Sequence, residues 1–69
     1  MSSNYYIQTE TGTPIIYFGG WDHFGEIITK ENPDYIYRMQ RTVAERNLYK
    51  VEEFLRRKCV VKKLKENLQ

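Results

Sequence analysis

The chain has 69 residues, a formal net charge of +2 at pH 7 and a single cysteine. This length allows one domain with a small core, and one cysteine excludes a disulfide within the chain. One cysteine and one histidine cannot supply the three or four nitrogen and sulfur ligands of a zinc site, so we expect neither a metal nor a cofactor.

The charge is divided unevenly along the chain, and the division falls near residue 34. Residues 1–34 carry one base against five acids, and they contain all four glycines, both prolines and the tryptophan. Residues 35–69 carry ten bases against four acids and contain no glycine or proline. We therefore expect one domain over residues 1–69, with a β-rich acidic half at about 4–30 and a helical basic half at about 33–69.

Three short runs in the acidic half have the composition of β-strands. Residues 5–9 and 14–18 are rich in aromatic and β-branched side chains and flank a glycine-containing connection, which predicts a hairpin. Pro14 fits the first residue of the second strand, and the pair Gly19 and Gly20 is expected to end it. A third run at residues 26–30 completes a meander of three antiparallel strands.

Two helix starts follow, and they leave two interpretations open. The first is a capping sequence with a proline at the first helical position, and it consists of Asn32, Pro33 and Asp34. The second is a capping box formed by Thr42 and Glu45. The chain from Pro33 into the fifties is either one long helix, or one turn at 33–37, a connection or short strand at 38–40 and a main helix at about 43–57.

The main helix is predicted by apolar residues that share one helical face. These residues are Ala44, Leu48, Val51 and Leu55, and Phe54 is expected to widen the stripe. Residues 58–64 are ambiguous, because a β-branched pair favours a returning edge strand while Val61 and Leu64 would also continue a helix. The edge strand is the preferred reading, since it would extend the sheet that the helix covers.

The expected fold is a small α+β domain, an antiparallel sheet of three to four strands with one amphipathic helix packed on one face. The core is expected to consist mainly of aliphatic residues from both halves of the chain, namely Ile7, Ile16, Ile28, Ala44, Leu48, Val51, Leu55 and Val61. Cys59 is expected to pack as a small apolar residue at the edge of this core, although its basic neighbours could instead activate the thiol.

The order of these elements resembles that of small uncharacterised phage-encoded ββαβ proteins. The matching segments are the hairpin at 5–18, the strand at 26–30, the Asn-Pro-Asp turn at 32–34, the helix start at 42–45 and the closing run at 59–64. Some small phage proteins of this build bind and block a host enzyme. The resemblance therefore implies an inhibitor of a host enzyme, and it transfers no role to any single residue.

A glycine-flanked aromatic loop is the best candidate for contact with a partner protein. The candidate residues are Trp21, Asp22, His23 and Phe24 in the loop, together with Tyr6 on the sheet. The alternative is that Trp21 and Phe24 fold back as core aromatics. Asp22 and His23 do not predict a catalytic pair, because neighbouring residues of an extended segment point to opposite sides. We expect no catalytic residues and no enzyme activity.

A nucleic-acid-binding surface is the alternative hypothesis. Its basic candidates are Arg56, Arg57, Lys58, Lys62 and Lys63, and exposed sheet tyrosines would stack bases. Alternation in the first strand turns Ile7 inward and leaves Tyr6 on the solvent side, and the pairs Tyr5 with Tyr17 or Tyr6 with Phe18 could share an exposed face. The same basic run also reads as a solvated helix surface.

The sequence as a whole predicts a cytoplasmic protein-binding module. The lone unpaired thiol suits a reducing compartment, and the longest apolar run, residues 15–18, is too short to cross a bilayer. The expected partner is a host or cognate protein, with nucleic acid as the alternative and no membrane. A homo-oligomer is the third possibility, because so small a core gains stability from a second copy.

Overall fold

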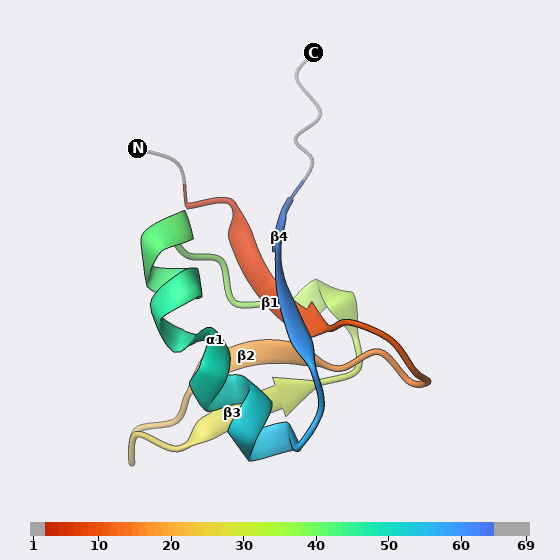
Figure 1. The fold of residues 1–69 in the computed structure, drawn as a ribbon. Coiled ribbons are helices and arrows are strands. Elements are labelled where there is room, and N and C mark those ends of the chain that lie inside the picture. Colours follow the sequence, from red (N-terminus) through yellow and green to blue (C-terminus); the bar gives the residue numbers. More distant parts are fainter. Residues whose placement is uncertain (1–2, 65–69) are drawn as a thin grey trace.

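The computed structural model describes residues 3–64, which form a four-stranded antiparallel sheet with one α-helix. In chain order the elements are β1 (Tyr5–Thr9), β2 (Tyr17–Trp21), β3 (Ile27–Lys30), the 3-10 helix η1 (Pro33–Tyr35), α1 (Arg41–Leu55) and β4 (Cys59–Lys63). The strand order is β3-β2-β1-β4, and α1 crosses one face of the sheet (Figure 1). The predicted fold class is confirmed; residues 65–69 of the expected basic half lie outside the described residues.

The chain between β3 and β4 forms two separate helices, so the interpretation with one long helix is wrong. The carboxamide oxygen of Asn32 accepts a hydrogen bond from the amide of Asp34 at 2.9 Å, which confirms the predicted start, but η1 ends at Tyr35. The predicted capping box is wrong, because α1 begins at Arg41 and Gln40 occupies the N-cap without a side-chain bond. Thr42 therefore lies inside the helix rather than at its cap.

The second strand begins later than predicted and runs through the glycine pair instead of ending there. Phe18 pairs with Thr29, and Trp21 pairs with Ile27, so two glycines face one residue of β3. This β-bulge is possible because the second glycine, Gly20, has a φ of +95°, in the left-handed region that favours glycine. Pro14 lies in the preceding loop, not in the strand.

A segment of three residues, 37–39, links β1 to β2 where the two strands diverge. The strands pair directly only at Gln8 and Tyr17. The amide of Tyr37 donates to the carbonyl of Phe18 at 3.0 Å, and Met39 exchanges two backbone hydrogen bonds with Tyr5, of 2.9 and 3.0 Å. This crossing segment satisfies backbone groups that would otherwise be unpaired in the gap, and it places two side chains against the core.

The core lies between α1 and the sheet, and it includes two residues that were not predicted, Phe18 of β2 and Met39 of the crossing segment. Its buried apolar members are Ile7, Phe18, Met39, Ala44, Val51 and Cys59, with Leu48, Leu55 and Val61 packed against them. The prediction that Ile16 and Ile28 belong to the core is wrong: Ile16 precedes β2, and Ile28 alternates with Ile27 and Thr29 and lies on the sheet face away from α1. Phe54 does not widen the helical stripe, since it is 51% exposed.

Thr9, a buried polar residue at the end of β1, has hydrogen-bond partners for both its side chain and its backbone amide. Its hydroxyl oxygen accepts a hydrogen bond from the amide of Ile16 at 3.0 Å, and its own amide donates to the carbonyl of Ile16 at 2.9 Å. The side chain is fully buried. A buried hydroxyl is tolerated here because it has a partner.

Candidate functional site

The glycine bulge decides which way the tryptophan points. In a regular strand Trp21 would lie on the same face as Tyr17, because side chains alternate with a period of two. The extra residue at the bulge shifts the alternation by one position, and Trp21 lies opposite Ile27. Its ring contacts buried Phe18, with centroids 5.0 Å apart and planes at 79°.

The crossing segment adds a third ring to this contact. The Tyr37 ring lies 5.7 Å from that of Phe18 and 5.5 Å from that of Trp21, both in edge-to-face geometry. Trp21 and Tyr37 are each 40% exposed, whereas Phe18 is fully buried. We call the two half-exposed rings the aromatic edge. The helix α1 packs mainly on β1 and β4 rather than on β2, the strand that carries Trp21.

The turn between β2 and β3 is held by one carboxylate. An oxygen of Asp22 accepts hydrogen bonds from the amides of Phe24 and Glu26, both at 2.9 Å, and the Asp22 amide donates to the carbonyl of Glu26. The carboxylate therefore orders the backbone of the turn, as in an Asx-turn. The His23 ring packs against that of Phe24 with centroids 4.2 Å apart and planes at 39°, and the Asp22 carboxylate accepts from backbone amides rather than from His23.

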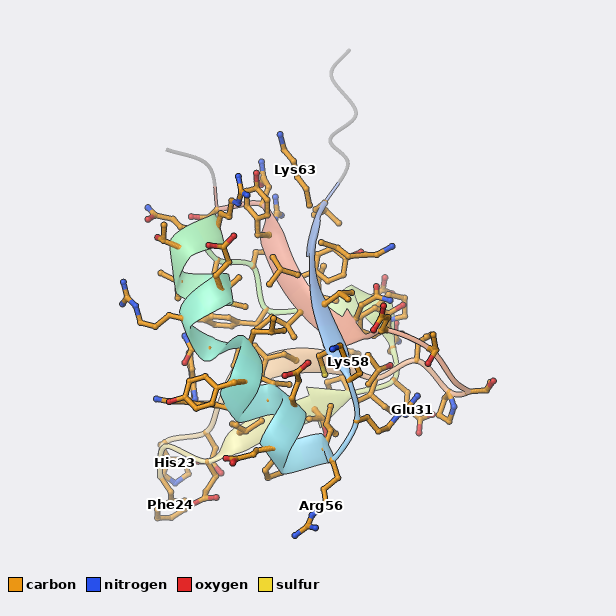
Figure 2. The ribbon with its side chains drawn as sticks, in the orientation of Figure 1. His23, Phe24, Glu31, Arg56, Lys58 and Lys63 are labelled. Carbon is orange, nitrogen blue, oxygen red and sulfur yellow. The ribbon has the colours of Figure 1, made fainter. Side chains whose placement is uncertain are left out.

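Figure 2 shows His23 and Phe24 next to each other at the lower left of the molecule, at the end of the turn between β2 and β3. We call these two residues the tip. Phe24 is 77% exposed, the largest exposed fraction among the large hydrophobic side chains of the described residues. The structure thus brings Trp21 and the tip to the same turn, and it adds Tyr37, which the sequence did not reveal.

Tyr6 lies apart from this turn. Tyr5, Ile7 and Thr9 face α1 or the core, so Tyr6 lies on the opposite side of the sheet, which we call the open face. Its ring neighbour is Tyr17, at 6.2 Å, which replaces both pairs considered from the sequence. Burial first, and then Tyr17, raise the pKa of Tyr6 above its ordinary value of 10.0, so its phenol is neutral at physiological pH.

The five basic candidates are divided between the turn that joins α1 to β4, which carries Arg56, Arg57 and Lys58, and the two faces of β4, which carry Lys62 and Lys63. Figure 2 shows Lys63, Lys58 and Arg56 spread along the length of the molecule. The guanidinium of Arg57 donates to the carbonyls of Thr11 and Pro14, at 2.6 and 3.1 Å, so it fastens the loop between β1 and β2. Lys62 pairs with Tyr6 and lies on the open face, whereas its neighbour Lys63 lies on the other face.

An open groove of about 850 Å³ lies where α1 turns into β4. It is lined by Tyr49, Glu52, Glu53, Arg56, Arg57 and Lys58. Glu52 accepts a hydrogen bond from the amide of Cys59 at 3.0 Å, so two of the charged lining residues already have structural partners within the fold.

Cys59 is buried in the core, as predicted by the interpretation in which it packs as a small apolar residue. Burial is the main cause that raises the pKa of its thiol above the ordinary value, Glu52 adds to the increase, and Arg57 opposes it. A thiol with a raised pKa is mostly protonated at neutral pH and is therefore a poor nucleophile. The alternative of a thiol activated by its basic neighbours is not supported.

Comparison with known protein families, curated proteins and solved structures finds no match. Within residues 3–64, no group of three or more His, Cys, Asp and Glu side chains is arranged to hold a metal ion. The same residues contain no helix that is long and apolar enough to span a membrane.

Proposed function

We propose that this protein is a non-enzymatic protein-binding module that contacts its partner through the aromatic edge and the tip. The observation that carries the proposal is the edge-to-face cluster in which Trp21 and Tyr37 stay 40% exposed above buried Phe18. Tryptophan and tyrosine are enriched among the residues that dominate binding energy. Rings already fixed by packing lose little conformational freedom when a partner covers them.

The tip supports the same proposal by a different physical argument. Phe24 is large, apolar and 77% exposed, yet its backbone is fixed by the Asp22 carboxylate. Burying a phenylalanine side chain contributes about 1.5–3 kcal/mol, and this contribution stays available for a partner. A rigid turn that presents an exposed aromatic ring is suited to fill an apolar pocket.

Charge and resemblance narrow the choice of partner. The acidic half of the chain contributes the turn, and Glu26 is exposed beside the tip. We therefore expect an apolar pocket with a basic rim, and binding that weakens moderately as salt screens this attraction. The resemblance to small phage-encoded proteins makes a host enzyme the first partner to seek, with inhibition of that enzyme as the expected result.

The test is affinity capture from a cell lysate, with and without nuclease, using matched alanine variants. Phe24→Ala should reduce the affinity for a captured protein at least about tenfold, because truncating a central aromatic residue costs about 2 kcal/mol or more. Tyr49→Ala is the control, since Tyr49 is 60% exposed but lies on α1. Phe24 supports no core residue, so thermal melts should show both variants folded.

The aromatic edge is tested by a second variant, at Trp21. Trp21→Ala, measured below its own melting temperature, should weaken binding of the same protein. A partner that binds the wild type, Phe24→Ala and Trp21→Ala equally well would show that this end of the molecule is not the binding surface.

A further inference from the structure

We propose that the open face of the sheet is a second binding site, and that it binds single-stranded nucleic acid. One residue from each strand forms a diagonal row across this face, in the order Lys30, Tyr17, Tyr6 and Lys62; the row steps by two residues at β1, because Gln8 is the residue directly opposite Tyr17. The proposal does not depend on the aromatic edge, since none of these four residues belongs to it.

The register of the sheet places the four side chains on one face. Tyr17 is directly opposite Lys30 on β3, and Tyr6 is directly opposite Lys62 on β4. Residues directly opposite each other in a sheet project to the same side. The two halves of the row meet where the rings of Tyr6 and Tyr17 lie 6.2 Å apart. Each tyrosine therefore has a lysine directly opposite on one neighbouring strand and the other tyrosine ring diagonally across on the next strand.

The chemistry of the row fits a nucleic-acid strand. Tyrosine rings provide surfaces on which bases stack without regard to sequence, and lysines contact phosphates. Neighbouring strands are about 4.8 Å apart, so the four strands span roughly 14 Å, with both rings between the two charges. No acidic residue stands among the other open-face positions of the strands, which are Gln8, Gly19, Ile28 and Val60.

The lysines at the two ends of the row have different surroundings. The ammonium of Lys30 lies 5.6 Å from the centroid of the exposed Tyr35 ring, which adds a third aromatic surface beside the row. Exposed Glu31 follows Lys30 directly in the chain, and its negative charge opposes phosphate binding at this end. Among residues 3–64 Lys62 makes no salt bridge, and its side chain is exposed, so we expect Lys62 to contribute more phosphate contact than Lys30.

The chain supplies a matched control for charge. Lys62 and Lys63 are adjacent and both exposed, but they project to opposite faces of β4. Lys62→Gln and Lys63→Gln therefore make the same change in net charge at neighbouring positions. If the row binds the nucleic acid, Lys62→Gln should alter the affinity and Lys63→Gln should not.

The experiment measures fluorescence anisotropy of a labelled oligothymidylate of about 12 nucleotides, titrated with the full-length protein at several salt concentrations. Losing one phosphate contact should reduce the slope of log affinity against log salt by about 0.7 in Lys62→Gln and leave the slope of Lys63→Gln unchanged. Tyr6→Leu should weaken binding about 5- to 150-fold, whereas Tyr6→Phe should keep the ring and the affinity.

Thermal melts must show that Tyr6→Leu is folded, and the matched pair Lys62→Gln and Lys63→Gln keeps the test decisive if it is not. The proposal is overturned if the wild type shows no saturable binding at low salt, or if both glutamine variants lose affinity equally. It is also overturned if poly-glutamate competes as well as unlabelled oligothymidylate, because the face would then select acidic chains in general. Phe24→Ala should bind the oligonucleotide like the wild type, which separates this proposal from the protein-binding one.

Discussion

Replacing Gly20 by alanine tests whether the bulge and the crossing segment are packed as described. A Cβ at this position would lie 2.8 Å from Cδ1 and 3.2 Å from Cε1 of the Tyr37 ring, and the backbone φ is +95°. The left-handed conformation costs an alanine about 1–2 kcal/mol. Crowding against a packed ring adds about 1–3 kcal/mol.

These two costs are large for a domain of this size, whose stability is on the order of 3–10 kcal/mol. We expect Gly20→Ala to lower the melting temperature by at least about 10 °C in a circular-dichroism melt. The fluorescence of Trp21 should also change below the transition, because its ring contacts the ring of Tyr37.

The variant Gly25→Ala measures the free-energy cost of the left-handed backbone without the crowding that Gly20→Ala introduces. Gly25 has a φ of +82°, and nothing lies within 4 Å of a Cβ added there. Gly25→Ala should therefore lower the free energy of unfolding only by the cost of the left-handed backbone, about 1–2 kcal/mol. In a Tyr37→Ala background the crowding is gone, so Gly20→Ala should there cost no more than Gly25→Ala. Equal losses from Gly20→Ala and Gly25→Ala in the wild-type background would refute the packing of Tyr37 against the bulge.

Two further predictions concern the turn into β4. Arg57→Ala should lower the free energy of unfolding by about 1–2 kcal/mol, because the carbonyls of Thr11 and Pro14 lose their donor, whereas Lys58→Ala should change it by less than about 0.5 kcal/mol. Equal effects in urea melts would contradict the loop-fastening role. Burial raises the pKa of the Cys59 thiol above 9.0, so iodoacetamide at pH 8 should react slowly with the native protein and quickly in urea. The thiol's contribution to stability is present below pH 9.0 and is lost as the pH rises through the folded-state pKa, so the fall in stability at alkaline pH should be smaller in Cys59→Ala. Rapid modification of the native thiol at pH 8 would refute its burial.

The sequence by itself determined the elements whose signals are local. The helical spacing of Ala44 and Val51 identified the buried face of α1, and both residues are in the core. Asn32 marked the start of η1, because a cap depends only on residues within one turn. The alternating pattern of β1 placed Ile7 in the core and Tyr6 on the open face. These features repeat every two to four residues and can be predicted without knowing what the chain folds against.

The tertiary structure alone decided the faces of the later strands and the composition of the two proposed sites. The bulge at Gly20 turns Trp21 toward Phe18, and one inserted residue reverses which side every later residue faces. A glycine pair inside a strand-like run is a recognisable bulge signal, although the sequence alone suggested a strand end. Tyr37 reaches the aromatic edge through a backbone hydrogen bond to Phe18, a contact between residues far apart in the sequence.

The open face depends on the same kind of information. Tyr17 meets Tyr6 and Lys62 joins them because of how β2 and β4 align with β1, and no local pattern specifies that alignment. Composition identified tyrosines and lysines as candidates, but it could not tell Lys62 from Lys63. Strand register made that distinction, since adjacent residues of a strand project to opposite faces of the sheet.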